Sequence, residues 1–431
     1  MSCFVAKGSP QAVIGAEEKR TLLASALQQV GRPLRRVLLL PPDQTRLNSN
    51  AGEICRILLA LLGPEAQVDI MPALGTHAAM TSDDLRLMFG PEIPLAKFRV
   101  HDWRRDLRHV GDIPGAKLRE WSEGRIDYDV RIEVNKILFA EYDLILSIGQ
   151  IVPHEVAGMA NYTKNVLVGA GGADVINKSH FLGAVYGMER IMGRADTPVR
   201  RLLTYGAEKF LGSLPILYIL TVMAKDAGTG QMAMRGLYVG DDMATFAAGA
   251  RLSQQVNLDL LEKPLRKVVV YLDPAEFRST WLGNKAIYRT RMAIADGGEL
   301  VVLAPGLREF GEDPEINRLI ARYGYRGTPA TLAAVREHEE LRCNLSAAAH
   351  LIHGSTEGRF TVTYCPGPGL GAAALGDVGF AVADLATTLR RYDPGRLRDG
   401  FNTLPDGEEV FFISNPALGL WALKQQFADT V

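Results

Sequence analysis

The chain has 431 residues, of which 47% are hydrophobic and 23% are charged, which is typical of a soluble globular protein with more than one domain. Its 48 basic and 49 acidic side chains give a net charge of −1, so its electrostatics give no reason to expect nucleic acid or an anionic membrane as a partner. A small anionic substrate is compatible with this balance, because it needs only a local basic pocket.

The four cysteines argue against a metal knuckle, a redox motif or a disulfide framework. Cys3, Cys55, Cys343 and Cys365 are widely spaced and form no CxxC pair. The first fifteen residues lack the basic and then apolar layout of a signal peptide. The most apolar stretch, Leu214–Met223, is about half a membrane span. We therefore expect a cytoplasmic protein.

Short apolar runs alternate with helical patterns through the first half of the chain. Strands are predicted at Arg36–Leu40, Gln67–Met71, Leu144–Ile148 and Ile216–Val222. Helices are predicted at Ala51–Leu62, Thr81–Met88, Ile132–Ala140 and Met243–Leu261. This alternation indicates an α/β fold with a mostly parallel sheet that is flanked by helices.

A second strand and helix series follows a break at Glu262–Lys267. Its strands are predicted at Val268–Leu272, Leu300–Leu303, Phe360–Tyr364 and Val410–Ile413. We therefore predict two α/β domains: a cofactor-binding and catalytic domain over residues 1–263 and a domain over 264–416 that closes over the substrate. Residues 417–431 are predicted to form a terminal helix that packs back on the first domain. The active site is expected in the cleft between the domains.

Polar residues gather just past three of the predicted strands. Asp43, Thr45 and Arg46 follow the first strand, His77 follows the second, and His154 follows Leu144–Ile148. In an open α/β sheet, ligands bind outside the carboxyl ends of the strands. These side chains are therefore expected to share one edge of the sheet.

Each of these residues also has a structural interpretation. Asp43 and Thr45 would cap the helix that follows them, and Arg46 would lie on the surface. His77 would be a turn residue after a glycine, and His154 would be a hydrogen-bonded loop histidine. Their shared location favours function over these alternatives, because two histidines would then lie beside a threonine–arginine pair that suits phosphate.

The segment after His154 carries further candidates. It contains Lys164, a glycine cluster at Gly169–Gly172, and His180. Glycines of this kind let backbone approach a nucleotide, although the spacing matches neither a P-loop nor GxGxxG. The structural alternatives are a solvated lysine and a histidine at a helix N-terminus with Ser179 as the cap.

Five separated motifs resemble the nickel-dependent lactate racemase family. They are DQTR (Asp43–Arg46), ALGTH (Ala73–His77), PHEVAGM (Pro153–Met159), Lys164, and NKSH (Asn177–His180). Their order and the intervals between the last three fit the family. The resemblance is strong between about residues 36 and 190 and weak in the second half of the chain.

The resemblance implies a nickel-pincer nucleotide, pyridinium-3-thioamide-5-thiocarboxylic acid mononucleotide, which other proteins assemble. Lys164 would hold it covalently through a thioamide, and His180 would ligate the nickel ion. Asp43, Thr45 and Arg46 would hold its ribose and phosphate. A sulfur-rich site with one imidazole is a reasonable nickel environment.

The implied reaction inverts C2 of an α-hydroxy acid. His77 and His154 would act as the acid/base pair, because histidine exchanges protons near neutral pH. One histidine would remove the 2-OH proton while hydride moves to the cofactor. The resulting 2-keto acid would turn, take the hydride on its other face and regain a proton from the opposite histidine.

Two departures from the family bear on the cofactor and the substrate. A Ser-Gly-Gly run before the lysine is replaced by Asn161–Thr163. In Trp281–Met292, Tyr288 matches a cofactor-binding tyrosine, whereas Arg289 and Met292 replace a glutamine and a lysine. Arg289 would clamp a carboxylate, which favours a larger hydroxy acid, a sugar acid or a dicarboxylate over lactate.

Arg291 and Lys285 are alternative cations for that clamp. Two competing hypotheses differ in function. One is a dehydrogenase-like enzyme with a free nucleotide, which the absence of GxGxxG argues against. The other is a non-catalytic cofactor-binding relative, which would have no need of His77 and His154.

Overall fold

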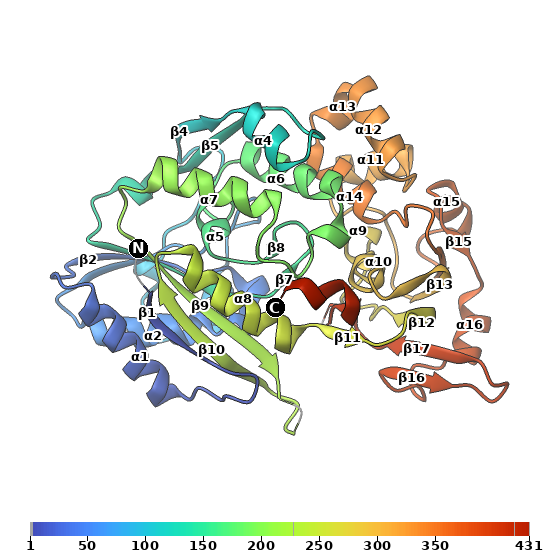
Figure 1. Cartoon of the computed structure of the whole chain (residues 1–431), viewed down its shortest axis with the longest axis horizontal. Coiled ribbons are helices and arrows are strands. Elements are labelled where there is room, and N and C mark those ends of the chain that lie inside the picture. The colour runs from blue at the N-terminus through green and yellow to red at the C-terminus, as the bar shows by residue number, and fades with distance from the viewer. Residues whose placement is uncertain (1–2, 227, 418, 431) are drawn as a thin grey trace. The chain divides into compact units, whose positions relative to one another are not determined.

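The computed structural model describes residues 3–226, 228–417 and 419–430. In it the chain forms two compact units, each with its own sheet (Figure 1). The first contains the residues up to Leu182 together with Arg190–Asn257, and the second contains Gly183–Glu189 and the residues from Leu258 onward. The chain therefore passes between the units after Leu182, after Glu189 and after Asn257.

The first unit is built on a six-stranded sheet in the order β1-β10-β9-β6-β2-β3. Its strands are β1 (Cys3–Gly8), β2 (Arg36–Leu40), β3 (Gln67–Ile70), β6 (Leu144–Gln150), β9 (Ile216–Lys225) and β10 (Met232–Gly240). The strands β3, β2, β6 and β9 run parallel, whereas β10 and β1 pair antiparallel. The carboxyl ends of β2, β3 and β6 therefore meet at one edge, as the sequence predicted.

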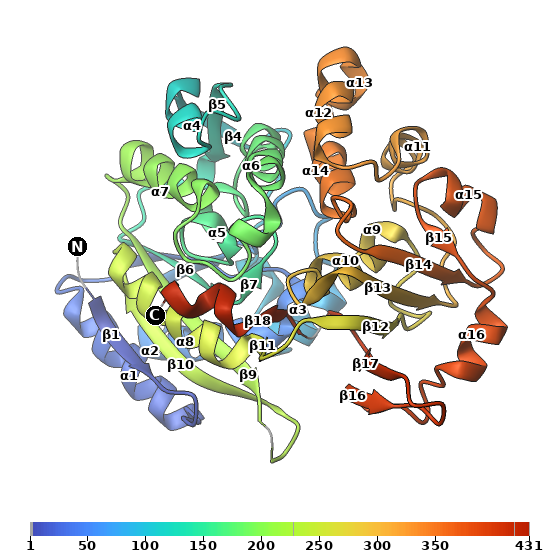
Figure 2. The ribbon, with the colours of Figure 1, turned by 45° about the vertical axis from the view of Figure 1, so that its right-hand side comes forward.

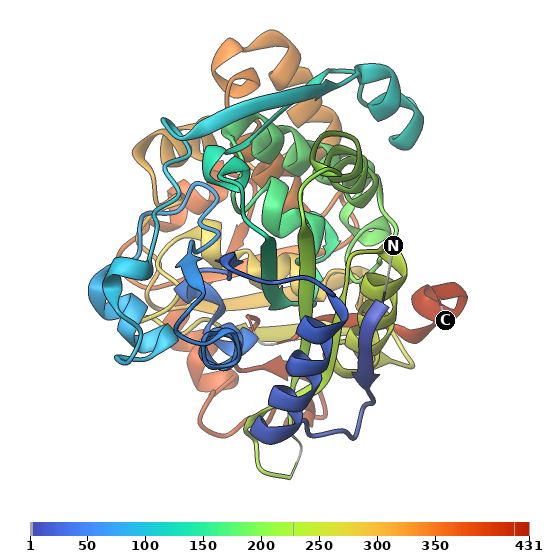
Figure 3. The ribbon, with the colours of Figure 1, turned by 90° about the vertical axis from the view of Figure 1, so that its left-hand side faces the viewer.

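Helices lie on both faces of this sheet. The helices that begin in this unit are α1 (Ala16–Gln29), α2 (Ala51–Leu62), α3 (Ser82–Phe89), α4 (Gly115–Trp121), α5 (Thr163–Leu167), α6 (Ala173–Tyr186), α7 (Pro198–Leu211) and α8 (Met243–Asn257). Helices α1 and α2 lie on one face (Figure 3). Their apolar residues pack against alternate residues of the strands. On the other face, α8 packs along β9 and β10 (Figure 1). The predicted mixed α/β class with helix-flanked, parallel-rich sheets is confirmed.

Short elements complete the first unit. Two antiparallel ladders pair β4 (Leu107–Ile113) with β5 (Val130–Asn135) and β7 (Pro153–His154) with β8 (Gly158–Met159). The 3-10 helices are η1 (Gln44–Ser49), η2 (Leu95–Lys97) and η3 (Lys136–Phe139). A fourth, η4 (Met188–Arg190), begins in the second unit and ends at Arg190, where the chain returns to the first. The predicted helix at Ile132–Ala140 is wrong. Val130, Ile132 and Val134 are fully buried between more exposed residues, which is the period of a strand.

The second unit holds another six-stranded sheet, in the order β15-β14-β13-β12-β17-β16 (Figure 2). Its strands are β12 (Leu265–Tyr271), β13 (Ile294–Ala304), β14 (Thr361–Pro366), β15 (Ala381–Val382), β16 (Gly400–Thr403) and β17 (Glu409–Ile413). All neighbours pair parallel except β16 and β17. The four strands predicted for this half are therefore confirmed.

Most helices of the second unit are short. They are α9 (Thr280–Gly283), α10 (Lys285–Thr290), α11 (Pro314–Tyr323), α12 (Thr328–Glu337), α13 (Glu339–Arg342), α14 (Leu345–His353), α15 (Ala372–Asp377) and α16 (Leu385–Arg391). Leu385 and Leu389 of α16 pack on one face of the sheet, and α10 contacts β13.

The end of one predicted helix and the whole of another are wrong. Helix α8 ends at Asn257, and the following residues form β11 (Asp259–Leu261). The predicted terminal helix is instead the strand β18 (Trp421–Leu423), which pairs parallel with β11, followed by the 3-10 helix η5 (Lys424–Thr430). The apolar residues of these short segments imitate the stripe of a helix, but the segments β11 and β18 are strands that pair with each other through their backbones. The functional division at residues 263 and 416 stays a prediction.

Among the described residues, no helix combines the length and the apolar character that a membrane crossing requires.

Candidate functional site

The loops after β2 and β3 lie side by side at the carboxyl edge of the first sheet. Pro42 and Ala73 form an isolated parallel bridge beyond the two strand ends. The Gly75 backbone N–H donates to the Gly169 carbonyl at 2.8 Å, which joins the second loop to the segment after Lys164. Three motifs that are far apart in the sequence are therefore assembled at one place.

Asp43 holds His77 and the start of its own loop. Its Oδ2 lies 2.6 Å from His77 Nδ1, and its Oδ1 accepts from the Thr45 backbone N–H at 3.1 Å and from the Thr45 hydroxyl. Asp43 is 3% exposed, whereas the His77 side chain is 58% exposed. Burial opposes ionisation of Asp43, but the hydrogen bonds from His77 and Thr45 prevail and lower its pKa. The capping interpretation of Asp43 is correct, and it coexists with the contact to His77.

Arg46 lies beside this group. Its guanidinium donates to the Thr45 carbonyl and to Thr45 Oγ1, both at 3.2 Å, and the Arg46 side chain is exposed. The positive charge of Arg46 lowers the pKa values of Lys164 and His154, so all three belong to one electrostatic neighbourhood.

His154 lies in β7, just past the end of β6. Its Nδ1 accepts hydrogen bonds from the backbone N–H groups of Val156 at 3.1 Å and Ala157 at 3.3 Å. Burial lowers its pKa well below the usual value, and the neighbouring cations lower it further against the opposing Glu155. His154 is therefore neutral at pH 7, with its proton on Nε2.

Lys164 lies in the short helix α5, which is fixed to the strand ends by the next residue. The Asn165 amide donates to the Leu40 carbonyl at 2.9 Å and to Ser147 Oγ at 3.0 Å, which joins α5 to β2 and β6. Burial, together with the charges of Arg46 and Arg200 and against those of the acidic neighbours, lowers the pKa of Lys164 to about 8. About a tenth of its amine is therefore unprotonated at pH 7, far more than for an ordinary lysine, and this is the form that a nucleophile requires.

His180 lies inside α6, so the interpretation of Ser179 as an N-terminal cap is wrong. Its Nδ1–H donates to the Ile176 carbonyl at 2.6 Å, one helical turn earlier. This bond leaves the Nε2 lone pair for a metal. Burial lowers the pKa of His180 to about 4, so the imidazole is neutral at pH 7. Within the described residues, no group of three or more histidine, cysteine, aspartate or glutamate side chains could hold a metal by itself.

Glu155 is the residue of this neighbourhood that we did not single out from the sequence. Its carboxylate raises the pKa values of His154, Lys164 and His180, so it lies close to all three. Its position inside the PHEVAGM motif was the available signal.

The glycine cluster serves packing within the protein. A Cβ on Gly169 would lie 2.7 Å from the Ala73 Cβ, and one on Gly171 would lie 1.7 Å from the Leu167 carbonyl oxygen. Close approach of backbone to backbone therefore explains why these two positions need glycine.

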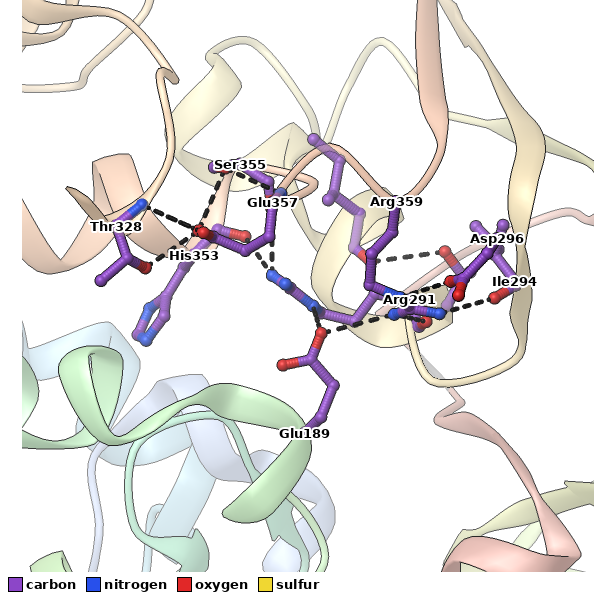
Figure 4. A network of polar contacts seen from close by, with 11 residues as sticks. Glu189, Arg291, Ile294, Asp296, Thr328, His353, Ser355, Glu357 and Arg359 are labelled. Atoms are coloured by element: carbon purple, nitrogen blue, oxygen red, sulfur yellow. Dashed lines mark hydrogen bonds and ion pairs between the residues drawn. The ribbon is translucent and has the colours of Figure 1, made fainter. Parts of the chain in front are cut away.

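Tyr288 and Arg289 lie on α10 of the second unit, where Tyr288 is buried. Their part in the site stays a prediction. Arg291, the alternative clamp, is 2% exposed and its Nε pairs with Glu189 at 2.6 Å (Figure 4). It also donates to the carbonyls of His353 and Ser355. Arg291 is thus occupied by contacts within the protein.

Comparisons with known proteins agree with this geometry. Residues 6–191 match the family described as the lactate racemase N-terminal domain. A lactate racemase from Thermoanaerobacterium thermosaccharolyticum is 28% identical over 197 residues, which are 42% of this chain and 41% of that protein. The aligned region therefore spans less than half of that relative.

Two solved structures share the fold over nearly the whole chain. A crystal structure of a protein from Thermotoga maritima has a TM-score of 0.77 and 21% identity, and covers 97% of this chain and 100% of its own. The lactate racemase apoprotein from Thermoanaerobacterium thermosaccharolyticum has a TM-score of 0.70 and 16% identity, with 97% and 94% covered. Residues 6–191 of the chain are therefore similar to the lactate racemase N-terminal domain, and the whole chain shares the fold of these two structures.

Proposed function

We propose that this protein is a racemase or epimerase that inverts C2 of an α-hydroxy acid by reversible hydride transfer. The observation that carries the proposal is the group around Lys164. A desolvated amine, the neutral imidazole of His180 and the Asp43–His77 pair lie around the carboxyl edge of one sheet. The match of residues 6–191 to the lactate racemase N-terminal domain supports the class of reaction.

These residues fit a lysine-tethered nickel-pincer nucleotide. The lowered pKa of Lys164 makes its free amine accessible for a thioamide link, and His180 has an Nε2 lone pair for nickel. Arg46 is an exposed cation that would hold the phosphate. Thr45 and Asp43 remain candidates for the ribose, although both Asp43 oxygens already accept hydrogen bonds. When bound, the nucleotide supplies a hydride acceptor.

His77 has the geometry of a general base. The Asp43 carboxylate can only accept in the 2.6 Å contact, so the His77 proton lies on Nδ1 and the Nε2 lone pair is available. His77 Nε2 would take the 2-OH proton as the C2–H bond breaks, and Asp43 would stabilise the resulting imidazolium. The substrate then becomes a planar 2-keto acid.

His154 starts from the opposite tautomer. Because its Nδ1 accepts from two backbone N–H groups, its Nε2 carries the proton and donates to the substrate oxygen. The pair thus presents one acceptor and one donor, which suits an oxygen that alternates between hydroxyl and carbonyl. For His154 to act as the base toward the other enantiomer, its proton must lie on Nδ1 instead of Nε2. Its ring must then lose the two hydrogen bonds that Nδ1 accepts from the backbone.

The substrate is proposed to be a hydroxy acid larger or more polar than lactate. Arg289 would bind its carboxylate through two parallel N–H donors, which a lysine does not provide. Loading would need the proteins that assemble the nucleotide. A dehydrogenase using a free nucleotide and a non-catalytic relative are the alternatives that an experiment must separate.

The test uses protein co-expressed with the assembly proteins and a panel of single-enantiomer hydroxy acids and sugar acids. We expect one class to be inverted, with retention of a C2 deuterium label and a primary isotope effect where hydride transfer limits the rate. Exchange of the C2 label with solvent would indicate proton abstraction instead. Net formation of keto acid would indicate a dehydrogenase.

A further inference from the structure

The backbone just before Lys164 adopts a conformation that normally requires glycine. Tyr162 has φ 58° and ψ −135°, and Asn161 before it has φ 66°. Side chains with a Cβ rarely occupy the region of Tyr162, and doing so costs free energy unless surrounding contacts enforce it. Such strain often marks a functional position.

Aromatic contacts hold the Tyr162 ring in place. The ring is 2% exposed, stacks on Phe246 of α8 with centroids 5.1 Å apart and planes at 17°, and lies 4.4 Å from the Tyr218 ring of β9. Both partners come from long, well-packed elements. The ring is therefore fixed by the sheet and by α8, and the strained backbone follows it.

A buried arginine ties the segments on either side of the strained pair. Arg200 of α7 is 1% exposed and donates to Thr163 Oγ1 at 3.0 Å and to the Met159 carbonyl at 2.7 Å. Its guanidinium also lies 4.4 Å from the Phe246 ring centroid. Among the described residues no carboxylate pairs with it, so its charge acts on Lys164 without an immediate counter-ion.

On the other side, Asn161 contacts both the strained turn and the end of β6. Its Oδ1 accepts from the Tyr162 backbone N–H at 2.7 Å, and a Cβ on Gly149 at the end of β6 would lie 1.8 Å from its Nδ2. The segment from Asn161 to Thr163 therefore packs against the end of β6 on one side and against Phe246 and Arg200 on the other.

We propose that Tyr162 is a positioning residue for Lys164. Its clamped ring forces the glycine-like turn, and this turn sets the direction in which the Lys164 amine leaves α5. This inference rests on the proposed function only in naming Lys164 as the attachment residue. If the Tyr162 ring served only to fill the core, the backbone at this position would not need to adopt a strained conformation, which only glycine adopts at low cost.

The test measures Lys164 in the apoprotein, without substrate or nucleotide. Acylation by acetic anhydride is followed against pH, and modification of the Lys164 peptide is quantified by mass spectrometry. Only the free amine reacts, so reactivity rises with pH through the pKa, near 8 in the wild type. Tyr162→Phe keeps the ring and should keep this midpoint. Tyr162→Gly should move it at least one unit toward about 10.4, the value of an ordinary lysine.

Two further variants complete the design. Glu141→Gly relieves another positive φ of 56° in the same unit, at an exposed position, and should leave the midpoint unchanged. Phe246→Leu removes the stacking partner and should shift the midpoint like Tyr162→Gly, which covers the case that Tyr162→Gly does not fold. A folded Tyr162→Gly or Phe246→Leu with the wild-type midpoint would overturn the proposal, as would an equal shift in Tyr162→Phe. Absence of any nucleotide adduct in the wild type would instead count against the proposed function.

Discussion

At the scale of single residues, the two candidate catalytic histidines differ in which ring nitrogen carries the proton. The Asp43 carboxylate draws the His77 proton to Nδ1, whereas two backbone N–H groups keep His154 Nδ1 unprotonated. The apoprotein is therefore asymmetric before substrate binds. In the proposed function, one histidine would accept a hydrogen bond from the substrate hydroxyl group and the other would donate one to it.

Long-range proton–nitrogen correlation spectra of the apoprotein should show this asymmetry directly. We expect a protonated Nδ1 for His77 and a protonated Nε2 for His154, since the partners of each ring fix its tautomer. The chain has eight histidines, so the signals are assigned with His77→Gln and His154→Gln. The same tautomer in both rings would contradict the roles proposed for them.

Asp43→Asn should lower kcat by about 100- to 10,000-fold, the range that a positioned acid or base contributes. The side-chain amide introduced by this substitution would donate to His77 Nδ1 and leave the proton on Nε2, where the lone pair is needed. Asp83→Asn is the matched control, because that side chain is 93% exposed on α3. Steady-state rates for both enantiomers measure the effect, and an Asp43→Asn rate within threefold of the wild type would exclude this role.

At the scale of elements, helix α5 has only five residues and could not hold Lys164 without outside contacts. Asn165 supplies them by joining α5 to the ends of β2 and β6. The same strand ends carry the loops with Asp43 and His154. One buried amide thus links the helix of the lysine to the two loops.

Asn165→Ala should reduce the free energy of unfolding of the first unit by about 2–3 kcal/mol, because it leaves the Leu40 carbonyl and Ser147 hydroxyl without this donor in a buried place. Gln29→Ala, on the exposed side of α1, should change it by less than about 0.5 kcal/mol. Hydrogen exchange of peptides from α5 and β6 provides the readout. Unchanged protection in Asn165→Ala would show that other contacts hold α5.

At the scale of the whole molecule, the chain enters the second unit at Gly183–Glu189 and leaves it again. Glu189 is bound there by Arg291 and lies 3.5 Å from Arg359, which also pairs with Asp296 (Figure 4). Helix α6 carries His180 in the first unit and continues into this segment. The two units are therefore joined covalently close to the candidate nickel ligand.

Glu189→Gln should destabilise the second unit by about 2–3 kcal/mol. This is less than the about 3–5 kcal/mol expected for a fully buried pair, because the Glu189 side chain is 31% exposed while that of Arg291 is 3% exposed. Faster hydrogen exchange in peptides around residues 345–360 would report it. Asp296→Asn, at a side chain that is 81% exposed, should have little effect, and equal effects of the two variants would contradict the ranking.

Much of the fold was predictable because buried parallel strands such as Arg36–Leu40 leave a short apolar signature. The position of the polar residues past β2, β3 and β6 was predictable for the same reason. The helix expected at Ile132–Ala140 failed because a short strand followed by a 3-10 turn imitates a helical stripe. The strain at Tyr162 could not be predicted, since it arises from rings that lie far away in the sequence.

The most direct measurement is the intact mass and nickel content of protein co-expressed with the nucleotide-assembly proteins. We predict one nucleotide adduct on Lys164 and about one nickel ion per chain. Lys164→Arg should carry neither, whereas His180→Gln should keep the adduct and lose most of the nickel, because only the metal contact is removed. A wild-type chain without adduct or nickel, beside a known family member loaded in the same host, would contradict the proposed cofactor site.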